Sequence, residues 1–174
     1  MKKILILVII GTLIGAIAFS GCLQTGTGFL VLKITDKPGD LNITKANVNI
    51  SQIKVHLSSG GNDSNDTGWY TVVNESQTFD LIALQNVTEL LGNVTLSAGL
   101  YTQIRLYIEQ VVLTIDGVEY DCKIPSNTIK LISPFQISAD NTTTLTLDFD
   151  IWESVHETGN GNYTFQPTIK IIQG

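Results

Sequence analysis

The chain has 174 residues, and 16 Asp and Glu against 10 Lys and Arg give it a net charge of −6 at neutral pH. This acidic balance opposes binding to nucleic acid and attraction to anionic lipid headgroups, so neither is an expected partner. Two cysteines are too few for a disulfide framework, and a hydrophobic core must therefore hold the fold together.

The N-terminus has the organisation of a lipoprotein export signal. Two lysines precede an uncharged apolar run from Ile4 to Phe19, and Ser20-Gly21-Cys22 follows. Small residues directly before a cysteine are what a lipoprotein signal peptidase requires, so we expect residues 1–21 to be removed and Cys22 to carry a lipid. The alternative is an uncleaved anchor, because Ile4 to Leu23 is long enough to span a bilayer as a helix. Both interpretations place the remaining chain outside the cell membrane, since the lysines hold the N-terminus in the cytoplasm.

The exported part is the size of one domain. Removal of the signal leaves about 150 residues, of which we expect 22–27 to be a tether and 28–174 to fold as a unit. The signal also takes two lysines with it, which leaves 8 Lys and Arg against 16 Asp and Glu, a net charge of −8.

Sequons for N-glycosylation are unusually frequent. Nine of the twelve asparagines begin an Asn-x-Ser/Thr motif. Chance would give roughly two, so the excess indicates selection for glycosylation, although a Ser-, Thr- and Asn-rich β protein could contain accidental matches. A lipoprotein signal together with dense sequons fits an archaeal cell-surface lipoprotein. The sequon asparagines are Asn42, Asn49, Asn62, Asn65, Asn74, Asn86, Asn93, Asn141 and Asn162.

Alternation of apolar and polar residues, which is typical of half-buried strands, dominates the chain after residue 26. The expected strands are 29–35, 46–57, 69–73, 78–82, 101–109, 111–115, 118–124, 128–132, 135–138, 145–151, 152–157 and 163–172. A change of phase near Ser51-Gln52 predicts a bulge or a break, and residues 58–68 have the composition of a loop. Asp116-Gly117 fits a type I′ turn and predicts a hairpin.

One segment departs from this alternation. Leu81, Leu84, Val87 or Thr88, and Leu91 recur at helical spacing before Gly92. This spacing predicts a short helix or helical turn over 82–91 that crosses one end of a sheet. Many short strands with frequent turn signals and a single helix predict an all-β fold. We expect one antiparallel β-sandwich of roughly eight to ten strands.

Several motifs, taken in order, resemble DUF4382, an uncharacterised family of archaeal and bacterial envelope domains. The resemblance spans roughly residues 28–172 and implies a β-sandwich that often follows a lipoprotein signal. It implies no catalytic residue, because no activity is established for the family. The motifs are Thr35-Asp36-Lys37-Pro38-Gly39-Asp40, Phe79-Asp80-Leu81, Leu90-Leu91-Gly92, Ala98 to Arg105, Asp116-Gly117, Leu145 to Asp150 and Gly159-Asn160-Gly161.

Four aspartates are candidate ligands for a hard cation such as Ca²⁺. Asp36 and Asp40 bracket a Pro-Gly turn, and Asp148 and Asp150 project from one face of their strand, opposite the core side. Carboxylate oxygens of this kind suit Ca²⁺. The alternative is a turn in which Asp36 caps backbone N–H groups, together with a solvated strand face. No other metal or cofactor is expected.

Residues 62–68 also resemble a calcium loop, with oxygen-bearing side chains at alternate positions and then Gly68. Asn74 stands where an EF-hand requires Glu, so a glycosylated flexible loop is the better interpretation. Cys122 lies on the apolar side of an alternating strand, which predicts a buried structural thiol.

The aromatic residues Trp69, Tyr70, Tyr101, Tyr107 and Trp152 could form a platform for sugars or fill the core. Tyr101 and Tyr107 fall on the polar side of their strand, so we expect both to be exposed. His56 should also face outward, beside Lys54.

No catalytic signature is present, and we expect no enzyme. Two functions remain open. The first is a structural or protein-interaction lipoprotein on the outer face of the cell membrane, held by its lipid and contacting an envelope or surface-layer protein. The second is a ligand-binding module for carbohydrate or a divalent cation. The oligomeric state stays open.

Overall fold

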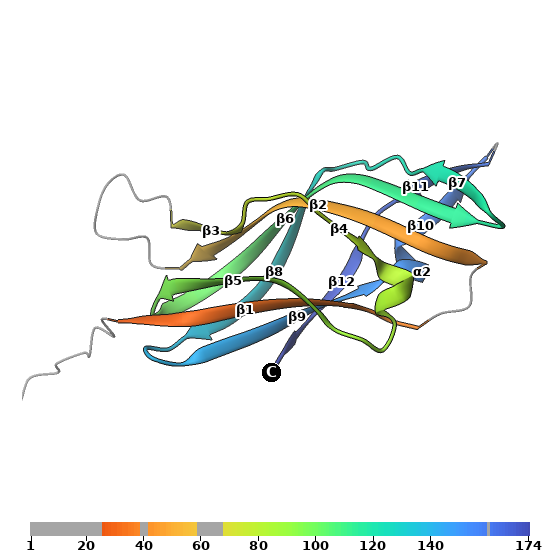
Figure 1. Cartoon of the computed structure of the whole chain (residues 1–174). Coiled ribbons are helices and arrows are strands. Elements are labelled where there is room, and N and C mark those ends of the chain that lie inside the picture. The colour runs from red at the N-terminus through yellow and green to blue at the C-terminus, as the bar shows by residue number, and fades with distance from the viewer. Residues whose placement is uncertain (1–25, 39–41, 59–67, 160) are drawn as a thin grey trace, which may run out of the picture.

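The computed structural model describes residues 26–38, 42–58, 68–159 and 161–174. Twelve strands and two helical turns form this part of the chain (Figure 1). The strands are β1 (Thr27–Asp36), β2 (Ile43–Leu57), β3 (Trp69–Val73), β4 (Gln77–Asp80), β5 (Glu89–Ser97), β6 (Gly99–Ile115), β7 (Val118–Asp121), β8 (Thr128–Ile137), β9 (Thr142–Asp150), β10 (Val155–Thr158), β11 (Asn162–Phe165) and β12 (Thr168–Gln173). The helical turns are η1 (Leu81–Leu84) and α2 (Ile151–Ser154).

Two sheets face each other as a sandwich, which confirms the predicted fold class. Sheet A has the strand order β12-β9-β1-β5. Sheet B is built on the long central pair β2 and β6, with β3 and β4 along β2 and with β7 and β8 along β6. The pairing is antiparallel except between β1 and β9, which run parallel in sheet A. The hairpin β10-β11 stands beside the sandwich.

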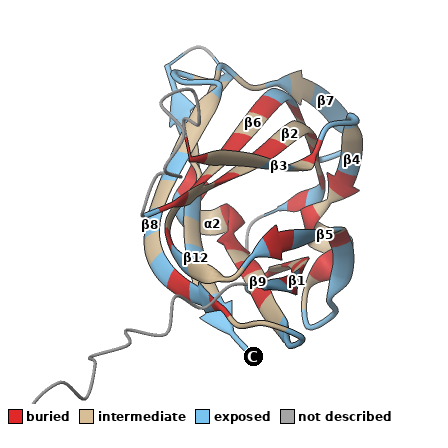
Figure 2. Ribbon diagram, turned by 90° about the vertical axis from the view of Figure 1, so that its left-hand side faces the viewer, coloured by how far each residue is buried: buried red, intermediate tan, exposed pale blue. Residues whose placement is uncertain are grey.

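The core lies between the two sheets. Alternate residues of each long strand are buried, as the colouring of Figure 2 shows for β2, β6 and β9. Leu30, Leu32 and Ile34 are fully buried on β1, and Leu145, Leu147 and Phe149 are fully buried on its neighbour β9. The intervening side chains point away from the core, so each sheet has an outer face of polar character.

The predicted short helix or helical turn over 82–91 is confirmed only in its first part. Helical structure there is limited to η1, whose first N–H groups are capped by the Asp80 carboxylate, which accepts a hydrogen bond from the Ile82 N–H at 3.2 Å. Asn86 then adopts a left-handed backbone with φ of 62°, and the chain continues as the edge strand β5. The helical spacing does not continue beyond η1, because Val87 is 55% exposed and Leu91 reaches the core from the strand β5.

Residues 151–154, predicted as strand, form α2, and the predicted strand 163–172 is divided into β11 and β12. Bulges account for other differences. The register of β2 against β6 shifts between Ile50 and Gln52, which confirms the predicted change of phase. The segments predicted as 101–109 and 111–115 form one strand, β6, and those around Pro134 form one strand, β8. Asp116 and Gly117 have φ of 49° and 78°, as a type I′ turn requires.

The predicted signal peptide, the predicted lipid attachment at Cys22 and residues 22–25 of the predicted tether lie outside the described residues. Thr27, predicted as part of the tether, is the first residue of β1. Within the described ranges, no helix is long and apolar enough to cross a membrane.

Candidate functional site

The outer face of sheet B carries a row of three cations on adjacent strands. Lys54 on β2 pairs with Arg105 on β6, and Arg105 pairs with Lys130 on β8. Paired residues project from the same face of a sheet, and neighbouring strands lie about 4.8 Å apart. We call Lys54, Arg105 and Lys130 the cation row.

No carboxylate of the described chain neutralises this row. The only ion pair among the described residues joins Lys37 to Asp150, on the other side of the molecule's core. Like charges placed directly opposite on paired strands destabilise a sheet. Three neighbouring cations in a chain with 16 Asp and Glu therefore carry a stability cost that a bound anion would remove.

Aromatic side chains hold the cations in place. The Arg105 guanidinium carbon lies 3.9 Å from the centre of the Trp69 ring, and its Nε donates to Gln103 Oε1 at 3.2 Å. The Lys54 Nζ lies 5.9 Å from the centre of the Tyr107 ring. Cation–π contacts of this kind favour one orientation of the cation, and the Arg105 terminal nitrogens stay available for a bidentate contact with a carboxylate. We call the row with Trp69 and Tyr107 the cation–aromatic face.

A shallow hollow of about 350 Å³ lies at the edge of this face. Its lining includes Trp69, Gln103, Arg105 and Ile132, which is 72% exposed. His56 also lines it and packs against Trp69 with 4.7 Å between ring centres, which confirms that His56 faces outward.

The expectation for Tyr101 is wrong, because Tyr101 is fully buried and stacks on Phe135 with 5.3 Å between ring centres. The cause is a register shift between Tyr101 and Gln103 against β8, which turns the strand face at that point. Tyr107, in contrast, is half-buried and lies on the outer face, as the alternation predicts.

The predicted calcium ligands are only partly brought together. Asp36 is 2% exposed, and its carboxylate accepts hydrogen bonds from the Ile151 N–H at 3.1 Å and from Gln85 Nε2 at 3.4 Å. Burial raises the pKa of Asp36 to about 6. The carboxylate therefore caps backbone as the alternative interpretation expected, but the helical turn that it caps is α2, more than a hundred residues further along the chain.

Asp150 is 8% exposed, so it does not form a solvated strand face. It accepts from the Glu153 N–H at 3.2 Å and from Lys37 Nζ at 2.9 Å. Burial raises the pKa of Asp150, but the hydrogen bonds from Lys37 and from the Glu153 and Trp152 N–H groups, together with the charge of Lys37, outweigh burial and hold this pKa below its usual value.

Asp148 lines an open hollow of about 320 Å³ together with Asp150 and Lys170, and Asp40 lies outside the described residues. In the part of the chain that the structure describes, no three His, Cys, Asp or Glu side chains are grouped to hold a metal ion. A calcium site stays a prediction, and Asp36 and Asp150 already serve the chain's own donors.

The sequon asparagines differ in their exposure. Asn49 is half-buried in the middle of β2, where its side-chain amide donates to Thr78 Oγ1 at 3.2 Å. Asn74 lies at the border of the cation–aromatic face and accepts from Gln52 Nε2 at 2.8 Å. Asn62 and Asn65 lie outside the described residues. The exposed sequon asparagines are Asn42, Asn74, Asn86, Asn93, Asn141 and Asn162.

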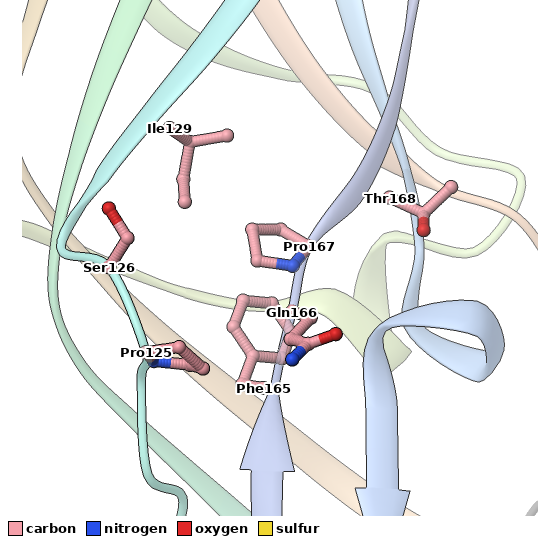
Figure 3. Close-up of a pocket in the computed structure, with 7 residues that line it drawn as sticks. All are labelled: Pro125, Ser126, Ile129, Phe165, Gln166, Pro167 and Thr168. Carbon is pink, nitrogen blue, oxygen red and sulfur yellow. The ribbon is translucent and has the colours of Figure 1, made fainter.

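A second hollow, of about 390 Å³, is mainly apolar. Pro125 and Ile129 lie on one side of it, and Phe165 and Pro167 lie on the other (Figure 3). Its residues come from the start of β8 and from the connection between β11 and β12. It contains no ionisable side chain among the residues that line it, so it offers shape and apolar surface only.

Cys122 is half-buried, and burial raises its pKa to about 11. Very little thiolate is present at neutral pH, as the predicted structural role requires.

Two residues of the cation row, Arg105 and Lys130, were not singled out from the sequence. Alternation places each of them on the polar side of a strand. Their meeting depends on strand register between segments far apart in the chain, and the sequence pattern does not contain that register.

The chain matches the family described as Domain of unknown function (DUF4382) over residues 27–167. The match confirms the resemblance seen in the motifs and covers both sheets of the sandwich up to the connection before β12. No curated protein and no solved structure matches the chain.

Proposed function

The chain belongs to the DUF4382 family, a domain of unknown function, and from that premise we propose that it is a non-enzymatic cell-surface lipoprotein that binds an acidic partner in the archaeal envelope. The outer face of sheet B is the proposed binding surface. The observation that carries this proposal is the cation row of Lys54, Arg105 and Lys130, which no described carboxylate neutralises.

The location rests on the sequence. The lipobox-like Ser20-Gly21-Cys22 and the nine sequons support a lipid anchor and an exposure outside the cell. A domain held at the membrane by a lipid has little need for high solution affinity, because the anchor keeps it at a high local concentration near its partner.

The composition of the face supports recognition. Trp, Tyr and Arg are the residue types that contribute most to binding energy at interfaces, and all three meet here in Trp69, Tyr107 and Arg105. Of the exposed sequon asparagines in the described chain, Asn74 alone contacts a residue of this face, Gln52. Glycans at the other exposed sites would leave the face open to a partner.

Site-specific crosslinking in the native cell tests this proposal. A photoreactive residue at Ile132, which is 72% exposed beside Arg105, should capture a defined envelope component. The matched control is Phe29, which is 52% exposed on the outer face of sheet A and should not capture it.

Arg105→Gln in the same chain should remove the product at Ile132, because the product depends on the cation row. Identical products from both positions, or a product at Ile132 that survives Arg105→Gln, would contradict the proposal.

A further inference from the structure

We infer that the ligand of the cation–aromatic face is an acidic polysaccharide, a chain of sugars bearing carboxylates, which lies across β2, β6 and β8. This inference rests on the proposed function and names the chemical class of its partner. A ligand that neutralises the whole cation row must carry several negative groups. Lys54 and Lys130 are two strand spacings apart, about 10 Å, so these groups must be distributed along an extended molecule.

The side chains around the cation row suit hydroxyl groups. On one side, Gln103 pairs with His56, and on the other, Tyr107 pairs with Gln52 and with Thr128. Thr71 continues the cation row onto β3, opposite Lys54. Amides and hydroxyls both donate and accept hydrogen bonds, as sugar hydroxyls do. Among the described residues of these three rows, none is a carboxylate that would repel an acidic sugar.

The two aromatic residues have different roles. One face of Trp69 is taken by Arg105 at 3.9 Å, so this ring orients the guanidinium. Tyr107 is more loosely engaged, with Lys54 Nζ at 5.9 Å. Its ring can pack against the apolar C–H face of a sugar while its hydroxyl remains in water.

The size of the face favours a sugar chain over an acidic protein. The cation row and the row on each side of it extend over four strands. Strands are about 4.8 Å apart and alternate residues along a strand about 6.8 Å apart, so this face measures about 14 Å in each direction, or about 200 Å². A stable protein interface buries about 800 Å² on each partner around an apolar centre. Ile132 is the only exposed large aliphatic side chain that lines the hollow here, so the face lacks such a centre.

Binding of the full chain, purified in detergent, to defined polymers tests the inference. The probes are polygalacturonate, its neutral methyl ester and poly-glutamate, and the measurement is isothermal titration calorimetry. We expect polygalacturonate to bind at least about tenfold more tightly than either of the other polymers, since charge and hydroxyls are both recognised. Added salt should weaken the binding.

Variants locate the site. Arg105→Gln should weaken polygalacturonate binding about tenfold, since a charge-assisted bidentate contact is lost. Lys130→Gln, at an exposed position, is the second variant in case Arg105→Gln disturbs the fold. Lys170→Gln removes the same charge from the exposed outer face of sheet A and should leave binding unchanged.

Each remaining outcome is decisive. Poly-glutamate and polygalacturonate binding equally, with both losing binding in Arg105→Gln, would indicate an acidic protein as the ligand. That result would overturn the inference of a polysaccharide and leave the proposed function intact. Equal weakening by Lys170→Gln would show attraction by overall charge and overturn the inference. If no acidic polymer binds, the inference of a polysaccharide ligand is overturned. The crosslinking experiment at Ile132 then tests the proposed function separately.

Discussion

Asp36 is the residue at which distant parts of the chain are joined. Its carboxylate accepts one hydrogen bond from Gln85, just after η1, and one from the backbone of Ile151, at the start of α2. The carboxylate is almost inaccessible, and burial raises its pKa from 3.8 to about 6. Ionisation of Asp36 therefore disfavours the folded state.

The sign of the resulting pH dependence follows directly. Between pH 4 and 6 the folded chain keeps the Asp36 proton while the unfolded chain has released it, so the free energy of unfolding falls as pH rises. The shift in pKa corresponds to a contribution of about 3 kcal/mol to the free energy of unfolding. This contribution is present below pH 4 and is lost above pH 6. Asp150, whose pKa is lowered, acts in the opposite sense and only below its usual value, outside this window.

Asp36→Asn should remove this dependence, because the amide oxygen can still accept from the Ile151 N–H but cannot ionise. Urea unfolding at pH 4, 5, 6 and 7 measures it, with a smaller decline in the free energy of unfolding expected for the variant. Asp116→Asn is the matched control and should keep the wild-type slope, because Asp116 is exposed, does not act on Asp36, and can be replaced by Asn in its type I′ turn. An unchanged slope in Asp36→Asn would contradict the argument.

At the scale of elements, the β6-β7 hairpin depends on one glycine. Gly117 has a left-handed φ of 78°, and no atom lies within 4 Å of the position that its Cβ would occupy. Any loss of stability on adding a side chain there is due to the backbone conformation alone. Contacts of the new side chain with other parts of the molecule do not contribute.

Gly117→Ala should lower the free energy of unfolding by about 1 kcal/mol, since alanine is strained at positive φ. Gly159→Ala is the control, because Gly159 also has open space around it but no positive φ. Urea unfolding of both variants at pH 7 measures the difference. Equal stability of the two variants would show that the turn tolerates an L-residue.

Local patterns predicted the elements that depend on local chemistry. Alternation identified β1, β2, β3 and β9, and Asp116-Gly117 identified its turn. Tyr101 was misplaced because a single bulge reverses the two faces of a strand. Unlike the bulge near Ser51, this one is not accompanied by a visible change of phase in the alternation. The leucines of 82–91 have helical spacing, but η1 and β5 divide them, since pairing of β5 with β1 outweighs the local preference.

At the scale of the whole molecule, charge is arranged against the overall balance. The chain is acidic, yet three of its ten Lys and Arg form one row, and the register of β2, β6 and β8 creates that row. The candidate calcium ligands show the opposite relation between sequence and structure. They are close enough in sequence to attract attention, but two of them are committed to capping α2. The sequence identifies residues that could bind a ligand, but the register of the strands determines which of their side chains lie next to one another.

Mass spectrometry of the protein from its native membrane tests how the molecule is presented. We expect its N-terminus to be a lipid-modified Cys22, because the small residues before this cysteine favour cleavage. A chain that still begins at Met1 would instead support the uncleaved anchor.

The same measurement maps the glycans on the folded surface. Asn49 should be unmodified, because its side-chain amide is half-buried between β4 and β6 and already donates to Thr78 Oγ1 at 3.2 Å. Asn93 is the matched position, since its sequon also lies within a strand but its side chain is exposed on the edge strand β5. A glycan on Asn93 and none on Asn49 is the expected result. Occupancy of Asn49 would mean that the sugar is attached before β2 and β4 pair, and that the outer face of sheet B is not kept free of glycan.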